Sequence, residues 1–373
     1  MKMWTTAIED AIRKIGSNIV GHPGQLPHIA EGQQYEWGDN DDWIEGFYVG
    51  MMWLSYEYSK DSFYKEAAAS WLGDFKHRLD HHIALDHHDI GFLYSLTAVA
   101  EWKITGSEEA RAVGLQAADT LCKRWREPAG ILQAWGLESD PENAGRIIID
   151  CLMNLPLLFW ATEETGDNRY YDIALQHAMK SRKFLVRGDA SSYHTFYFDP
   201  ATGSAIRGGT HQGYEDGSTW TRGQAWGIYG FALAYRYTRD EDFLNTSKSL
   251  AHYFINHLPE DSVAYWDFDV PLEAGTPRDS SASAIAASGL LELLDLLDAD
   301  DPDRAIYEAA LLRSMKSLVD HYATSGNPEA EGLLKHGSYH VRGERVPDGH
   351  MIWGDYYYLE ALIRMQTGIR GYW

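Results

Sequence analysis

Arg146-Ile147-Ile148-Ile149-Asp150-Cys151-Leu152-Met153-Asn154-Leu155-Pro156-Leu157-Leu158-Phe159-Trp160 is a nearly unbroken apolar stretch in which Asp150 is the only acid. A helix that is hydrophobic on all sides is buried in the protein interior. Burying a lone carboxylate costs free energy unless the group is used or hydrogen-bonded. Burial also raises a carboxyl pKa, so that the acid stays protonated near neutral pH. Asp150 is therefore a candidate general acid; alternatively, it caps the apolar helix that follows.

Several other segments share this apolar composition, which is rich in aromatic and small residues and predicts buried inner helices. With the first stretch they are residues 43–58, 90–105, 148–164, 223–237, 281–297 and 356–367. Amphipathic, charged segments alternate with them and predict half-solvated outer helices. These are residues 4–20, 62–79, 107–126, 168–186, 242–258 and 302–322. The alternation predicts an all-α fold, an (α/α)6 barrel formed as one domain over residues 1–373, because no linker of domain-boundary type interrupts it.

In such a barrel the inner helices run in the same direction, and their N-terminal ends gather at one mouth. Helix N-termini present backbone N–H groups that favour a bound anion. Asp89 stands directly before the inner helix 90–105 and would face the same mouth as Asp150. It could simply cap its helix, but paired carboxyl groups in a sugar-sized site are typical of glycoside hydrolysis.

Composition limits the ligand class. The formal charge of -23 argues against nucleic acid, whose phosphates need clustered Lys and Arg. Aromatic residues make up 13% of the chain, including 14 Trp and 23 Tyr, and flat rings commonly hold sugars in pockets. The ligand is therefore expected to be ring-shaped.

The same composition bears on compartment. Cys122 and Cys151 are the only cysteines and fall in helical patterns, so no disulfide framework or cysteine zinc site is indicated. The N-terminus lacks the apolar core of a signal peptide. No apolar run is long enough to cross a membrane. A cytoplasmic protein without a membrane partner is expected.

Four histidines near Asp89, His81, His82, His87 and His88, suggest a metal site. Their spacing matches no zinc motif, and H-E-x-x-H does not occur. We therefore expect no metal and no other cofactor. One of these histidines is expected to hydrogen-bond the substrate or to orient Asp89.

Residues 188–217 form a long, glycine-rich stretch. A loop of this length in a compact fold is usually functional, or is a small hairpin over the site. His194, His211 and Gln212 are candidate donors to a ligand. Alternatively, they satisfy the backbone of the loop itself, which is an equally good explanation for His211.

Arg222 follows that loop, at the start of an inner helix and between Trp220 and Trp226. Its guanidinium is suited to bind a planar carboxylate with two hydrogen bonds. A structural ion pair with a neighbouring acid is the competing explanation.

The motifs in this chain resemble those of unsaturated glucuronyl hydrolases, glycoside hydrolase family 88, in the same order over essentially the whole length. They are Leu85-Asp86-His87-His88-Asp89-Ile90-Gly91-Phe92, Gly145-Arg146-Ile147-Ile148-Ile149-Asp150, Ser192-Tyr193-His194-Thr195, Gly209-Thr210-His211-Gln212-Gly213 and Trp220-Thr221-Arg222-Gly223-Gln224-Ala225-Trp226. Several long motifs in one order are more specific than any short one. The resemblance also implies an (α/α)6 barrel.

The resemblance implies removal of a 4,5-unsaturated uronic acid from lyase-generated oligosaccharides. In the family mechanism one Asp protonates C4 of the enol ether while water adds at C5. That acid and base aligns with Asp150, and the supporting carboxylate aligns with Asp89. The residues that the resemblance places around the substrate are Trp43, His88, Trp135, His194, Gln212, Trp220, Arg222, Trp226 and Tyr339.

One departure from the family pattern concerns sulfation. Members acting on sulfated fragments carry a Ser-x-Ser-x-Lys type motif, whereas this chain has Gly337-Ser338-Tyr339-His340-Val341-Arg342, without the second Ser and the Lys. Unsulfated oligosaccharides from hyaluronan, chondroitin, gellan or xanthan are therefore the expected substrates.

The protein is expected to be a monomer or a weak homodimer.

Three other interpretations remain open at this point. An unsaturated rhamnogalacturonyl hydrolase would share the fold and the hydration chemistry. A sugar 2-epimerase of (α/α)6 type would use histidines rather than Asp150 as acid and base. A non-catalytic oligosaccharide-binding toroid would not need Asp150 for any chemistry.

Overall fold

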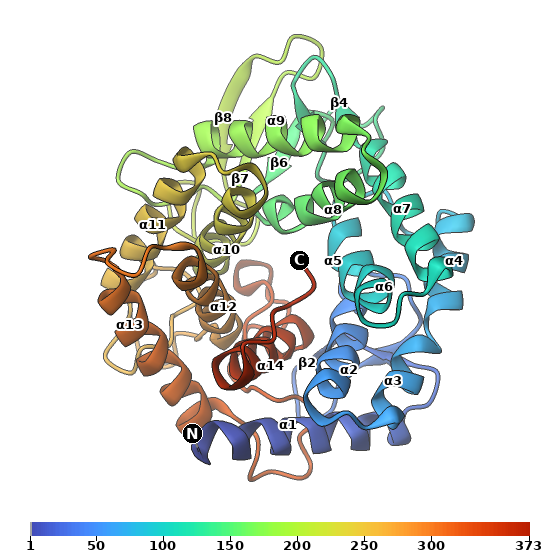
Figure 1. Cartoon of the computed structure of the whole chain (residues 1–373). Helices are drawn as coiled ribbons and strands as arrows, with labels where there is room; N and C mark the ends of the chain where they lie inside the picture. The colour runs from blue at the N-terminus through green and yellow to red at the C-terminus, as the bar shows by residue number, and fades with distance from the viewer. Residues whose placement is uncertain (1) are drawn as a thin grey trace.

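The computed structural model describes residues 2–373 as a ring of helical hairpins (Figure 1). The inner helices are α2 (Glu45–Ser59), the continuous run α5 (Ile90–Tyr94), η1 (Ser95–Val99) and α6 (Ala100–Thr105), then α8 (Leu155–Thr165), α10 (Thr221–Thr238), α12 (Ser280–Leu296) and α14 (Ile352–Thr367). The outer helices are α1 (Lys2–Gly21), α3 (Ser62–Ala69) with α4 (Leu72–Asp80), α7 (Glu108–Cys122), α9 (Asn168–Leu185), α11 (Glu241–Asn256) and α13 (Arg304–Ser317) with η3 (Leu318–Tyr322). The predicted all-α (α/α)6 barrel is confirmed.

Short turns join inner helices to outer ones by a repeated device. An inner helix ends at a residue in the left-handed region, which is favourable for Gly, and the next residue caps the outer helix with its side chain. The pairs are Lys60-Asp61, Gly106-Ser107, Gly166-Asp167 and Arg239-Asp240. These turns keep one face of the ring compact.

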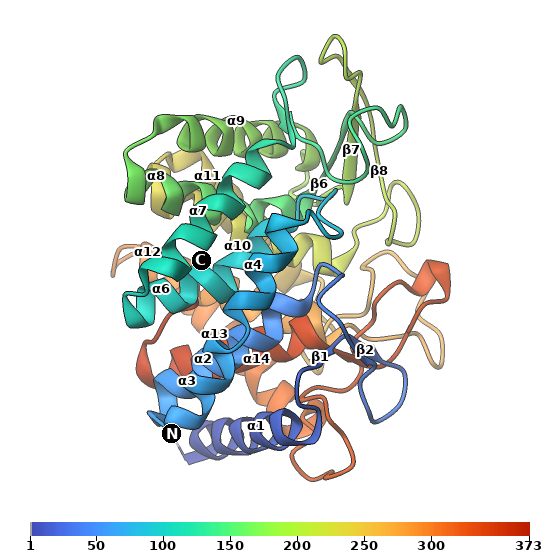
Figure 2. The same cartoon turned by 90° about the vertical axis from the view of Figure 1, so that its right-hand side faces the viewer.

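The long connections gather on the opposite side of the ring, the right-hand side of Figure 2. They contain short antiparallel strands, β1 (Leu26–Pro27) with β3 (Trp37–Gly38), β2 (Ile29–Ala30) with β9 (His350–Met351), β4 (Trp125–Arg126) with β5 (Ile131–Leu132), and the sheet β6 (Arg146–Ile148), β7 (Thr195–Phe198) and β8 (Ala205–Gly209). Residues 188–217 thus contain the hairpin β7–β8, one of the two structures expected for that stretch. This side is the mouth.

Four predicted helix bounds were wrong, one of them that of the last inner helix, which begins at Ile352 and not at residue 356. Residues 148–164 do not form one helix: β6 leads into the 3₁₀ helix η2 (Ile149–Met153), and α8 begins only at Leu155. Pro156 explains the break, because in a continuous helix its N–H would donate to the carbonyl of Leu152, whereas a proline without an N–H is tolerated in the first turn of a helix. The predicted helix 62–79 is interrupted between α3 and α4, and the helix predicted over 107–126 ends at Cys122.

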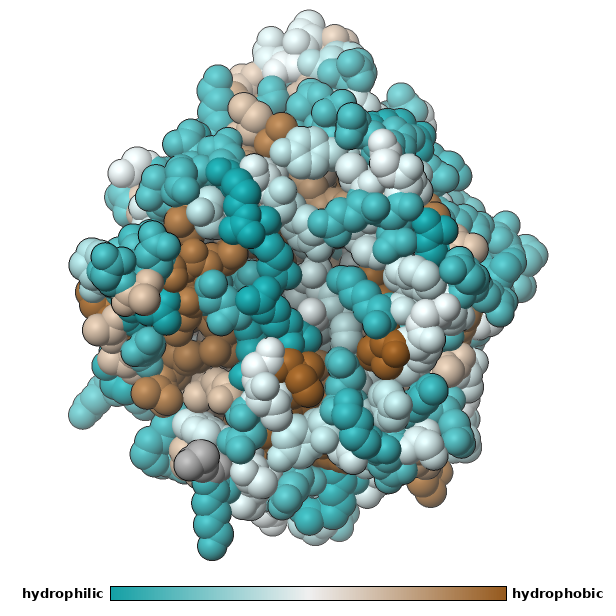
Figure 3. Space-filling model, viewed as in Figure 1, coloured by the Kyte–Doolittle hydropathy of each residue, from teal (hydrophilic) through white to brown (hydrophobic). Residues whose placement is uncertain are grey.

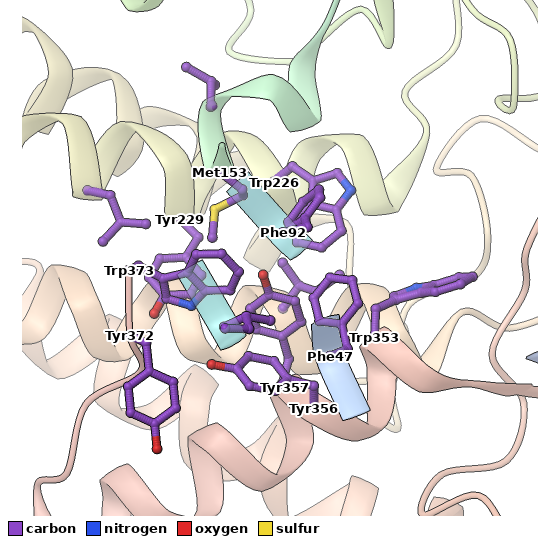
Figure 4. Packing of buried hydrophobic residues seen from close by; sticks show 14 of the residues in the cluster. Phe47, Phe92, Met153, Trp226, Tyr229, Trp353, Tyr356, Tyr357, Tyr372 and Trp373 are labelled. Atoms are coloured by element: carbon purple, nitrogen blue, oxygen red, sulfur yellow. The ribbon is translucent and has the colours of Figure 1, made fainter. Parts of the chain in front are cut away.

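Aromatic rings fill the centre of the barrel (Figure 4). Trp373 stacks on Tyr357 with ring centroids 5.9 Å apart, and Phe92 contacts Trp226 at 5.3 Å. This aromatic core closes the barrel behind the mouth.

The face in Figure 3, which carries the C-terminus, is largely hydrophilic, in keeping with the acidic composition. Within residues 2–373, none of the helices has the length and apolarity that crossing a membrane requires.

Candidate active site

Asp150 lies in η2, where the chain leaves β6 and enters the inner ring. The β6–β7 pairing and a bond from Ile149 N–H to the His194 carbonyl (3.0 Å) fix this turn. Neither η2 nor α8 has a side-chain cap, so the structure does not support the capping interpretation of Asp150. Its Oδ1 is buried and has no hydrogen-bond partner within residues 2–373.

Asp89 precedes α5 and is 5% exposed, and it likewise makes no capping bond. Asn154 connects the two carboxylate-bearing segments: its Oδ1 accepts from Phe92 N–H at 2.8 Å, and its Nδ2 donates to the Asp150 carbonyl at 3.3 Å. Gly91 makes this approach possible, because a Cβ there would lie 2.4 Å from the Asn154 Cα.

The two carboxyl groups have opposite pKa shifts. Burial, reinforced by the charge of Asp89, raises the pKa of Asp150 to about 8. Burial also acts to raise the pKa of Asp89, but His88 and His87 outweigh it and the net pKa lies below its ordinary value. At neutral pH Asp150 is therefore an acid and Asp89 a carboxylate, as expected when neighbouring acids divide one charge.

His194 is a hydrogen-bond donor to the site. Its Nδ1 accepts the backbone N–H groups of His211 (3.0 Å) and Gln212 (3.2 Å), so the ring proton must sit on Nε2. Nε2 is buried and has no partner within the described chain. Burial keeps the pKa of His194 well below its usual value, so the ring is a neutral donor.

Of the four histidines near Asp89, His87 and His88 lie equally close to its carboxylate, His87 Nδ1 at 3.4 Å from Oδ2, and only His88 also groups with Asp150. His88 Nε2 is 3.4 Å from Asp89 Oδ1, and burial lowers the pKa of His88 to about 4. His81 and His82 are exposed. His88, Asp89 and Asp150 have ligand-type atoms within 4.8 Å of one another and could surround one cation. No metal is expected from the spacing of the histidines, and chelation tests that expectation.

Aromatic side chains form two groups near the mouth. In one, the His194 ring lies 4.4 Å from Trp220, and the His211 ring lies 5.1 Å from Trp135. In the other, Trp353 contacts Trp43 at 5.1 Å and Tyr339 at 5.5 Å. We call Trp43, Tyr339 and Trp353 the aromatic wall; Trp43 and Tyr339 are half-buried, whereas Trp353 is 0% exposed and supports them from the buried side. Trp226 is 1% exposed and packs on Phe92 and Tyr357, and its contact with a ligand stays a prediction.

Arg222 is engaged by the protein itself. Its Nη1 pairs with Asp279 Oδ2 at 2.7 Å, and Nη2 donates to the Tyr339 carbonyl at 2.7 Å. Gln212 Nε2 donates to the same carbonyl at 2.8 Å. The ion-pair explanation of Arg222 therefore describes this structure, and the contribution of Arg222 to carboxylate binding stays a prediction.

Sequence reasoning gave Asp279 and Trp353 no role in this site, although it placed both among the segments that enter inner helices at the mouth. Asp279 is the N-cap of α12, and Trp353 lies in the first turn of α14. Asp279 contacts Arg222, which lies 57 residues earlier in the sequence.

Comparison with known proteins agrees with this geometry. The family described as Glycosyl Hydrolase Family 88 matches residues 17–368. An unsaturated glucuronyl hydrolase of Bacillus sp. (strain GL1) is 56% identical over 372 residues, 100% of this chain and 99% of the relative. An unsaturated chondroitin disaccharide hydrolase of Streptococcus pyogenes serotype M1 is 44% identical over 99% of this chain and 92% of the relative. The crystal structure of the Bacillus sp. GL1 enzyme, 56% identical, matches with a TM-score of 0.98 over 99% of this chain and 98% of that one. The chain therefore belongs to glycoside hydrolase family 88, as its motifs predicted.

Proposed function

We propose that this enzyme releases the 4,5-unsaturated uronic acid from the non-reducing end of lyase-generated oligosaccharides by hydrating the C4=C5 double bond. Two relatives support the substrate class. One is an unsaturated glucuronyl hydrolase that is responsible for the degradation of glycosaminoglycan. The other is an unsaturated chondroitin disaccharide hydrolase. The observation that carries the proposal is Asp150, a half-buried residue with one enclosed carboxyl oxygen and a pKa of about 8 beside a second carboxylate.

In the proposed reaction Asp150 gives its proton to C4, and the resulting positive charge is shared by C5 and the ring oxygen. Water adds at C5 and passes a proton to the Asp150 carboxylate, which restores the acid. The hemiketal at C5 then opens to a ketone, and the hemiacetal left at C1 releases the remaining saccharide. One residue thus serves as acid and then as base, which its pKa near the working pH allows.

The other groups of the site would bind the sugar and stabilise the positive charge that forms on it. Asp89, ionised beside Asp150, would stabilise the positive charge near C5. The free Nε2–H of His194 would donate to a sugar oxygen. The half-buried rings of Trp43, Trp135 and Tyr339 would stack on sugar faces, with Trp353 packed against two of them from the buried side. His88 and His194 have lowered pKa values and are neutral near pH 7, so they are poorly suited to the histidine acid chemistry of a 2-epimerase.

The test follows the loss of ultraviolet absorbance of the conjugated double bond. Wild type should consume an unsaturated disaccharide, and Asp150→Asn should not. Asp86→Asn is the control, because Asp86 is exposed and lies three residues before Asp89. Full activity in Asp150→Asn together with its loss in His194→Ala would refute the assignment of the acid.

Substrate choice is tested with a matched pair of chondroitin disaccharides. Because the segment 337–342 lacks the second Ser and the Lys of the sulfate-associated motif, the unsulfated disaccharide should have the higher kcat/KM. Equal or faster turnover of the sulfated form would contradict this. The panel also includes unsaturated gellan, xanthan and rhamnogalacturonan fragments. Turnover of the rhamnogalacturonan fragment alone would indicate an unsaturated rhamnogalacturonyl hydrolase instead.

A further inference from the structure

We propose that Asp279 is a positioning residue that holds the aromatic wall of the active site. This inference rests on the proposed function and concerns how the same site is kept in shape. Asp279 is fully buried (0% exposed) at the N-cap of α12. Both of its carboxylate oxygens lead to residues of the site.

The first connection runs through Oδ2, which accepts from Arg222 Nη1 at 2.7 Å. Both side chains are buried, so the guanidinium depends on this carboxylate for its partner. Arg222 in turn donates to the carbonyls of Ser338 and Tyr339, the latter at 2.7 Å. Asp279 thereby fixes the backbone that carries the Tyr339 ring.

The second connection runs through Oδ1, which accepts from Ser281 N–H (3.1 Å), the Ser281 hydroxyl and Ser338 N–H (3.4 Å). Because the hydroxyl gives its one proton to Asp279, its lone pairs remain free to accept. They accept the indole N–H of Trp353 at 3.0 Å. The orientation of Trp353 is thus tied to the same carboxylate.

These connections meet in the aromatic wall. Tyr339 and Trp353 contact each other at 5.5 Å, and Trp353 contacts Trp43 at 5.1 Å. One carboxylate therefore supports two of the three rings from behind. Binding geometry is sensitive to shifts of about 0.5 Å, so loosening this support should weaken substrate binding more than chemistry.

The first test compares two buried serines on α12. Ser281 links Asp279 to Trp353, whereas the Ser283 hydroxyl accepts from Ala264 N–H at 2.9 Å. Ser281→Ala should raise KM about threefold or more with a smaller change in kcat, because ring support affects ground-state and transition-state binding alike. Ser283→Ala should leave KM unchanged. Unchanged KM and kcat in Ser281→Ala would overturn the proposal.

The second test compares two helix caps. Asp279→Asn keeps an oxygen for the cap but removes the charge facing Arg222, and should raise KM about tenfold. Asp240→Asn is the control, since Asp240 caps α11 by accepting from Asp242 N–H at 3.0 Å. If Asp279→Asn does not fold, Ser281→Ala decides. A folded Asp279→Asn with wild-type KM would overturn the proposal.

A structural readout separates this inference from the proposed function. If wild type consumes no unsaturated disaccharide, the proposed function fails, but the support of the rings is still measurable. Crystal structures should show a displaced Trp353 indole in Ser281→Ala and an undisplaced one in Ser283→Ala. An unmoved indole in Ser281→Ala would contradict the inference.

Discussion

Buried acids at the two ends of the barrel differ in what surrounds them. Near the C-terminal ends of the inner helices, Glu292 is 0% exposed and is bonded by Arg236 at 2.7 Å and by Arg364 at 2.6 Å. Burial acts to raise its pKa, but the two guanidinium groups outweigh burial and lower it. At the mouth, Asp150 has one oxygen without a hydrogen-bond partner among residues 2–373 and an acid for a neighbour, and its pKa rises. Burial alone therefore does not set the direction of a carboxyl pKa shift; the charges around the group do.

The largest expected effect separates the two ends by activity. Asp150→Asn should lower kcat about 1,000-fold or more, because an amide cannot donate the catalytic proton. Glu292→Gln should leave kcat per folded molecule unchanged. Initial rates normalised to folded protein measure both, and equal losses in the two variants would contradict the comparison.

For stability we expect the reverse order, with a larger loss in Glu292→Gln than in Asp150→Asn. Glu292→Gln leaves two buried guanidinium groups without their carboxylate and should destabilise the fold by about 3–5 kcal/mol. Denaturant unfolding of wild type and variant measures this difference. A stability loss in Asp150→Asn larger than that in Glu292→Gln would mean that the carboxylates had been assigned the wrong roles.

The pH profile sharpens the comparison further. Activity should fall as pH rises through about 8, where Asp150 loses its proton. Asp89 contributes to that raised pKa, so Asp89→Asn should move the high-pH limb about one pH unit toward acid, besides lowering kcat. The profile of log(kcat) against pH measures the shift. A limb that moves toward alkali would refute the proposed coupling.

A smaller effect is expected on thermal stability. Because the folded-state pKa of Asp150 lies above its unfolded value near 3.8, wild type loses stability as pH rises from about 4 to about 8. Asp150→Asn should therefore melt about 2 °C or more above wild type at pH 8.5, and the gap should shrink toward pH 4. The melting temperatures of both proteins across this range give the result.

Asp355 provides the control for that experiment. Burial raises its pKa to about 6, yet its oxygens accept from Tyr35 Oη and from the N–H groups of Leu333 and Leu334. An Asn there would turn an N–H₂ group toward donors. Asp355→Asn should therefore lower the melting temperature at every pH.

No effect is expected from metal removal. His88, Asp89 and Asp150 could surround a cation, but the proposed reaction needs Asp150 protonated. Prolonged treatment with a chelator should leave kcat/KM unchanged. Loss of activity that an added divalent cation restores would overturn the expectation of no metal.

The helices were predictable because their signal is local. Alternation of charged and apolar segments placed all six hairpins, and the lone acid in residues 146–160 pointed to Asp150. The break before Leu155 was missed because the apolar periodicity continued through it, although Pro156 was visible. A strand partner 47 to 51 residues away in sequence, as in the pairing of β6 with β7, leaves no local trace.

The site was predictable only in part, because its connections are not local. Motifs placed Asp89, Asp150 and His194 at the mouth, but the partner of Arg222 is Asp279, 57 residues later. The tautomer of His194 depends on backbone groups of His211 and Gln212, which sequence cannot orient. Trp226 was predicted to line the substrate site; it is 1% exposed and packs on Phe92 and Tyr357, and its contact with a substrate stays a prediction.

The most direct test of the central claim is a titration of Asp150 itself. Carbon-13 NMR of enzyme labelled at the Asp side-chain carboxyl, compared with Asp150→Asn, assigns the signal by difference. We expect a carboxyl that titrates at a pKa of about 8 and is absent from the variant. An Asp150 signal that titrates near pH 4 would show a carboxylate at neutral pH and would contradict its role as the acid.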